Sequence, residues 1–84
     1  MSARDFIMPS IKIGGYIFQF YSSDEHEPPH VHVKRGGSVA KIWLLPIEVQ
    51  SNRGYNDPEL NRVVKLTRAN SAKLLGKWHE HFKQ

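Results

Sequence analysis

The spacing of apolar residues changes abruptly at Asp57–Pro58, and this change restricts the chain to a fold with strands first and helix last. Before this point, β-branched and aromatic residues form short runs bounded by glycines and prolines, which is typical of strands. After it, apolar residues recur with a helical period and fall within one arc of roughly 120°. The residues of this arc are Leu60, Val63, Val64, Thr67, Ser71, Leu74, Leu75, Trp78 and Phe82. The sequence therefore predicts an α+β protein.

Three antiparallel strands are predicted in the first part of the chain, over residues 11–21, 30–34 and 39–45. The first strand needs a bulge or bend at Gly14–Gly15, because its apolar residues change parity there. The second and third form a hairpin at Arg35–Ser38, since paired glycines supply the positive φ angles of a tight turn. Ile47–Val49 extends the third strand briefly, and residues 50–57 are predicted to form a loop.

One long amphipathic helix is predicted from Pro58 to Phe82, with a kink or break at Asn70–Ser71, two poor helix formers. Asp57 is the expected N-cap, with Pro58 at the first helical position. We expect this helix to cover the apolar face of the three-stranded sheet. The predicted core includes Phe18, Trp43, Leu74 and Trp78.

A chain of 84 residues is sufficient for one domain, which we place at residues 11–84 after a flexible segment over residues 1–10. The absence of cysteine excludes disulfides and thiolate metal sites, and it suits a reducing cytoplasm. No apolar run approaches the roughly 20 residues that span a bilayer, so no membrane association is expected.

The net charge of +4 is concentrated in the C-terminal part, where residues 53–84 contain seven basic and three acidic groups. Four of the basic residues lie on the predicted polar side of the helix: Arg62, Lys65, Lys73 and Lys77. Such a face can dock an acidic protein partner or a nucleic acid. The alternative is an ordinary solvated helix face.

The segment from Asp24 to His32 carries the clearest functional signal, DEHEPPHVH. Alternation along a strand places His30 and His32 on one face, about 6–7 Å apart. With His26, these histidines can form a zinc-like divalent metal site, and Asp24, Glu25 or Glu27 are other candidate ligands.

A second interpretation of the segment needs no metal. His26, His30 and His32 can transfer protons, while Lys34 and Arg35 hold a phosphate, as in a metal-independent ribonuclease. Lys41 and nearby tyrosines can assist. A third interpretation is that His30 and His32 are ordinary strand residues, one hydrogen-bonded to a carboxylate and one solvated.

The chain resembles the bacterial family known as domain of unknown function 4160 (DUF4160) in four pieces. They are residues 20–33, Gly36–Gly37, residues 40–46, and the helix pattern Leu74, Leu75, Trp78 and Phe82. The resemblance implies a small protein encoded beside a partner of the DUF2442 type, in the manner of a toxin–antitoxin pair. It implies no catalytic residues. RNA or DNA remain candidate targets, and self-association into a homo-oligomer is left open.

Overall fold

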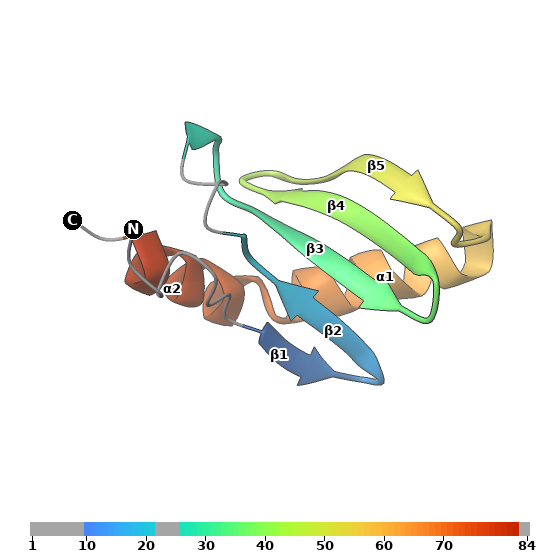
Figure 1. Cartoon of the computed structure of the whole chain (residues 1–84). Coiled ribbons are helices and arrows are strands. Elements are labelled where there is room, and N and C mark those ends of the chain that lie inside the picture. Colours follow the sequence, from blue (N-terminus) through green and yellow to red (C-terminus); the bar gives the residue numbers. More distant parts are fainter. Residues whose placement is uncertain (1–9, 22–25, 83–84) are drawn as a thin grey trace, which may run out of the picture.

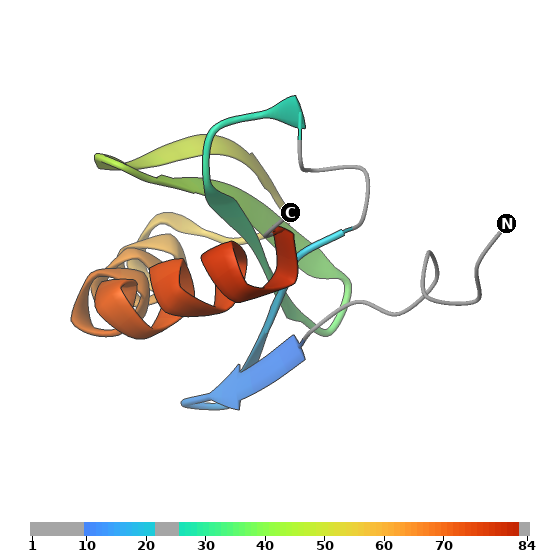
Figure 2. The ribbon, with the colours of Figure 1, turned by 90° about the vertical axis from the view of Figure 1, so that its left-hand side faces the viewer.

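A five-stranded antiparallel sheet and two helices make up the computed structural model, which describes residues 10–21 and 26–82. The strands are β1 (Ser10–Ile13), β2 (Tyr16–Gln19), β3 (His30–Arg35), β4 (Ser38–Leu44) and β5 (Ile47–Arg53). The helices are α1 (Asp57–Ala69) and α2 (Ser71–Phe82). Each strand pairs with its neighbours in the sequence, and both helices lie on the same side of the sheet (Figures 1 and 2). The chain is α+β, but the predicted three-stranded sheet with one long helix is wrong.

The first predicted strand, 11–21, is in fact a hairpin formed by β1 and β2. Gly14 and Gly15 have φ angles of 58° and 86°, and Ile13 pairs with Tyr16 across the turn. A two-residue hairpin turn with positive φ at both positions is favoured by two glycines. The change of apolar parity is explained by this turn rather than by a bulge, because Ile13 and Tyr16 are directly opposite each other.

The predicted loop over residues 50–57 is also wrong in its first half, since β5 continues to Arg53. The pairing with β4 shifts between Lys41 and Ile42, where Ser51 and Val49 are the successive partners. Gln50 is therefore the extra residue of a β-bulge. The prediction that Ile47–Val49 extends the third strand is wrong too, because these residues begin β5, which turns back and pairs with β4. The second half of β5 was missed because its side chains are polar and exposed.

The helical part divides at Asn70 into two helices. Asn70 ends α1, where its side-chain amide donates to the Leu66 carbonyl at 2.8 Å. The Leu74 N–H then donates to the Asn70 carbonyl at 2.9 Å, which starts α2. The N-cap of α1 is Asn56 rather than Asp57, because the Asn56 side chain accepts the Glu59 N–H at 2.9 Å.

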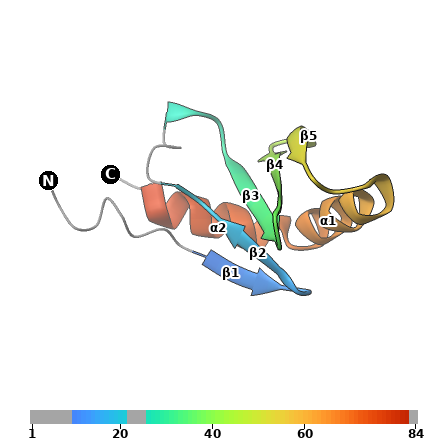
Figure 3. The ribbon, with the colours of Figure 1, turned by 45° about the vertical axis from the view of Figure 1, so that its right-hand side comes forward.

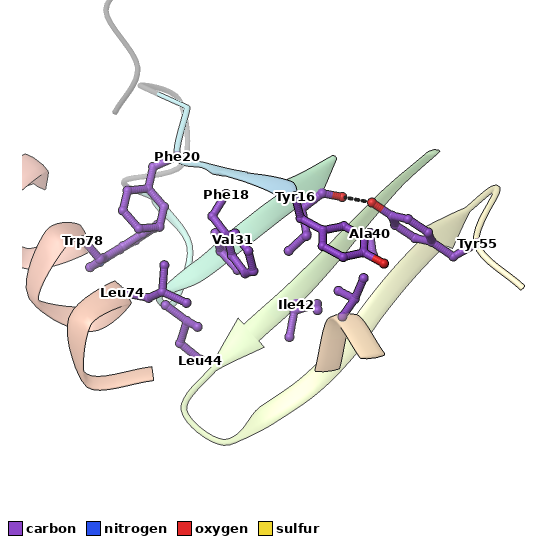
Figure 4. Close-up of a cluster of buried hydrophobic side chains, with 12 residues drawn as sticks. Tyr16, Phe18, Phe20, Val31, Ala40, Ile42, Leu44, Tyr55, Leu74 and Trp78 are labelled. Carbon is purple, nitrogen blue, oxygen red and sulfur yellow. Dashed lines mark hydrogen bonds between the residues drawn. The ribbon is translucent and has the colours of Figure 1, made fainter. Parts of the chain in front are cut away.

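The core lies between the sheet and the helices, and aromatic and branched side chains fill it (Figure 4). Its buried apolar members are Tyr16, Phe18, Phe20, Val31, Val33, Ala40, Ile42, Leu44, Tyr55, Val63, Leu74 and Trp78. Trp43, which the sequence placed in the core, is only half-buried. It occupies the other face of the sheet, because it alternates with Ile42 and Leu44 along β4.

Replacing Gly14 by alanine is expected to lower the free energy of unfolding by about 1–2 kcal/mol, because L-residues resist positive φ. The new Cβ would also lie 3.0 Å from Leu66 Cδ1 of α1. Gly76→Ala is the control, since nothing lies within 4 Å of a Cβ there and alanine favours the helix. Urea unfolding of both variants measures the difference. Equal stabilities would contradict the proposed role of the Gly14 turn.

Residues 1–9, and with them almost all of the predicted flexible segment, lie outside the described residues. Ser10 already belongs to β1.

Candidate functional site

The face of the sheet opposite the core is the candidate site. Among the described residues, no helix covers this face (Figure 3). Alternation along β3 and β4 directs His32 and Lys34, and then Val39, Lys41 and Trp43, to this side. The register pairs His32 with Lys41 and Lys34 with Val39. Across the next ladder, Val39 pairs with Arg53 and Lys41 with Ser51. We call this surface the open face.

An open depression of about 530 Å³ lies on the open face. Its lining residues are Tyr21, His32, Lys34, Val39, Lys41, Ser51, Asn52 and Arg53. Three of them are cations, and among the described residues that line the depression none is a carboxylate. A concave surface with one sign of charge attracts ligands of the opposite sign. The depression therefore favours an anion.

His32 is the histidine that lines the depression, and it is half-buried. The Tyr21 ring stacks on the His32 ring, with centroids 4.2 Å apart and planes at 28°. The Lys34 ammonium lies 4.9 Å from the Tyr21 ring centroid. These contacts hold the imidazole and a cation beside the same aromatic ring, so His32 is positioned next to positive charge.

Lys41 makes a short ionic contact on the open face. Its Nζ lies 2.6 Å from Glu27 Oε1, and 5.1 Å from the centroid of the Trp43 ring. Charge-assisted hydrogen bonds between an ammonium and a carboxylate are shorter and stronger than hydrogen bonds between neutral groups. The lysine side chain is 20% exposed and the glutamate side chain is 42% exposed, so both groups of this ion pair are accessible to solvent.

His30 has a different environment from His32, because its side chain is fully buried. Its Nδ1–H donates to the Pro28 carbonyl at 2.9 Å, since a carbonyl oxygen can only accept. Its ring also packs against Trp78 of α2, with centroids 5.2 Å apart, and against His32 at 5.1 Å. In this structure His30 supports His32 and joins α2 to the sheet.

The remaining predicted site residues lie apart from the depression. His26 is exposed just before β3. Arg35 projects to the side opposite Lys34, where its Nη1 lies 3.6 Å from Glu59 Oε2 and its guanidinium lies over the Tyr16 ring. The structure therefore does not bring Lys34 and Arg35 together, because consecutive strand residues point to opposite faces.

The four predicted helix residues are all exposed: Arg62, Lys65, Lys73 and Lys77. Both helices pack on the core face of the sheet, so these cations belong to a surface separate from the open face. Lys77 Nζ also lies 3.9 Å from Glu80 Oε1.

The described ranges 10–21 and 26–82 contain no group of three or more His, Asp or Glu side chains that could hold a metal ion. His26, His30 and His32 all lie within these ranges and do not form such a group. Asp24 and Glu25, the other candidate ligands, lie outside them. A zinc-like site stays a prediction.

Arg53 was not predicted as a site residue, and neither were Ser51 and Asn52, because residues 50–57 were assigned to a loop. Had β5 been extended, alternation from Val49 across the bulge would have placed Arg53 beside Val39. The contact between Glu27 and Lys41 joins residues 14 positions apart, and no local pattern predicts it.

The fold and site define a small α+β protein with a meander sheet, helices on one face and a cationic, aromatic opposite face. The chain belongs to the family described as "Domain of unknown function (DUF4160)", whose profile matches residues 15–79. Comparisons with curated proteins and with solved structures found no match. In the portion of the chain that the structure describes, neither helix has the length and apolar character needed to cross a membrane.

Proposed function

We propose that this DUF4160 protein binds RNA on its open face and acts on it through His32. The observation that supports the proposal most directly is the pairing of His32 with Lys41 inside a depression that Lys34 and Arg53 also line. An imidazole beside several cations suits a phosphodiester, whose charge the cations neutralise while the imidazole exchanges protons.

Single-stranded RNA fits this surface better than a duplex does. Proteins that bind single strands combine a cationic groove with aromatic side chains on which bases stack. The open face has both, since Tyr21 and Trp43 lie beside the lysines. An antiparallel sheet with one uncovered face is also a common platform for splayed, unstacked bases.

We further propose that the protein is the RNA-directed component of a two-gene module of the toxin–antitoxin type in the cytoplasm. The family resemblance supports this part, and a small protein of the DUF2442 type is the expected partner. Co-expression and co-purification of the two proteins tests it. If the two proteins do not associate, the proposed two-gene module is refuted, but the proposed RNA binding is not affected.

The alternative function is a non-enzymatic binding module that uses the basic helix face. The exposure of Arg62, Lys65, Lys73 and Lys77 favours it. On that basis an acidic protein partner or a nucleic-acid backbone would dock on the helices, and the open face would take no part.

Two double variants with equal change of charge distinguish these functions. Lys34→Ala with Arg53→Ala on the open face is expected to weaken binding of single-stranded RNA at least about tenfold, because two charge-assisted contacts are lost. It should also reduce the slope of log affinity against log salt by roughly 1.4. Fluorescence anisotropy from about 50 to 200 mM salt measures both quantities.

The matched control is Lys65→Ala with Lys73→Ala on the helices, which should bind RNA as the unmodified protein does. A loss of affinity in the helix variant only would support the alternative. Absence of RNA binding by the unmodified protein would refute the proposed function.

A further inference from the structure

Glu27 lies beside the open face although it belongs to the segment that precedes β3. Two hydrogen bonds anchor the residues that follow it: the Leu44 N–H donates to the Pro29 carbonyl at 3.0 Å, and His30 Nδ1 donates to the Pro28 carbonyl at 2.9 Å. Prolines at both positions restrict the backbone further. The Glu27 carboxylate is therefore attached to a fixed segment, as a preorganised site requires.

The same lysine lies next to both Glu27 and His32. Lys41 Nζ is 2.6 Å from the Glu27 carboxylate, and Lys41 is the direct cross-strand partner of His32. Side chains that are opposite each other on one face of an antiparallel pair have Cβ atoms about 5 Å apart. Lys41 thus links the two other groups: its ammonium contacts the Glu27 carboxylate, and its side chain is the cross-strand neighbour of the His32 imidazole, which lines the depression with it.

We infer that Glu27 and His32 are the base and the acid of an RNA-cleaving reaction, with Lys41 between them on the phosphate. The inference rests on the proposed function and deepens it, because it names the reaction and its residues. Glu27 is the residue that the sequence offered only as a candidate metal ligand. Its contact with Lys41 is what connects it to His32.

The reaction is an internal transfer that needs no further reactant. The Glu27 carboxylate takes the proton of the ribose 2′-hydroxyl, and the 2′-oxygen forms a bond to phosphorus. The bond from phosphorus to the 5′-oxygen breaks, and the His32 imidazolium gives its proton to that oxygen. The products are a 2′,3′-cyclic phosphate and a 5′-hydroxyl end. Lys41 stabilises the negative charge that builds on the phosphate oxygens.

An ordinary surface ion pair is the competing explanation of the contact between Glu27 and Lys41. Exposed ion pairs contribute little to stability, so Glu27→Gln should leave the fold intact under either explanation. The two explanations differ in catalysis, where a positioned general acid or base contributes about 10²–10⁴-fold.

The experiment compares cleavage of a random-sequence single-stranded RNA by the unmodified full chain, Glu27→Gln and His32→Asn. Mass spectrometry identifies the product ends. We expect cyclic phosphate ends from the unmodified protein and a rate at least about 100-fold lower in each variant. Glu27→Asp should recover part of the activity. Binding is measured separately on RNA with 2′-deoxy substitutions, which cannot react, and Glu27→Gln should bind it no more weakly.

Glu48→Gln is the matched control, because Glu48 is a carboxylate that pairs with Trp43 on the same face. It should cleave RNA at the unmodified rate. Cleavage by Glu27→Gln at that rate would overturn the inference. RNA that is bound but yields no cyclic phosphate would also overturn it while leaving RNA binding intact, whereas absence of binding would refute the proposed function itself.

Discussion

Replacing Trp78 by alanine is expected to lower the free energy of unfolding by about 3–5 kcal/mol, which is the usual range for a large buried aromatic residue. Trp78 lies between α2 and the sheet, and its ring centroid is 5.7 Å from that of Phe20 and 4.3 Å from that of Phe82. Small domains have only about 5–15 kcal/mol of stability in total. Urea unfolding should therefore show a variant that is close to unfolding at ambient temperature.

Trp43→Ala is the matched control, since the chain contains only these two tryptophans. Trp43 is half-buried on the open face, so its removal leaves no core cavity and should cost much less. Equal losses in the two variants would contradict the assignment of the two rings to opposite faces. The comparison also tests the correction of the predicted core.

Alkaline pH is expected to destabilise the protein through Tyr55. Burial, followed by the nearby Tyr16 and Glu59, raises the pKa of the Tyr55 phenol from 10.0 to about 12, and Arg35 opposes this rise. A folded-state pKa above the unfolded value means that the folded chain holds the proton more tightly. The associated stability is complete below pH 10 and is lost as the pH rises through about 12. A shift of this size corresponds to about 2–3 kcal/mol.

Tyr55→Phe isolates this contribution. The Tyr55 hydroxyl donates to the Val33 carbonyl at 2.9 Å (Figure 4), so its removal should cost about 1 kcal/mol near neutral pH. The variant should also lose less stability than the unmodified protein between pH 10 and 12. Identical pH profiles of the two proteins, measured by urea unfolding, would show that Tyr55 does not control alkaline stability.

Local patterns predicted some of the elements whose side chains contact the core, but not their number, since β1 and β2 were predicted as one strand and α1 and α2 as one helix. The helical arc from Leu60 to Phe82 was identified because its residues repeat with the period of a helix. The hairpin between β3 and β4 was placed correctly, since Arg35 pairs with Ser38 across the glycine turn. Leu66, the apolar residue outside the arc, packs against the Gly14 turn of a hairpin that the sequence reading did not resolve.

The candidate site could be predicted only in part. His32 and Lys34 follow from alternation along one strand, and the structure places both at the depression. Lys34 and Arg35 were predicted to hold one phosphate together, although consecutive residues of a strand point to opposite faces. Arg53 was missed with the polar edge strand that carries it.

The amino-acid sequence was enough to establish an α+β chain with an amphipathic C-terminal part, because periodicity and turn chemistry are local properties. Strand number, the choice of covered face and the neighbours of His32 depend on contacts between distant residues. Tyr21 meets His32 across 11 positions, and Glu27 meets Lys41 across 14. Such contacts arise only when hairpins pair and helices cover one face, so the tertiary structure alone decided which residues form the site.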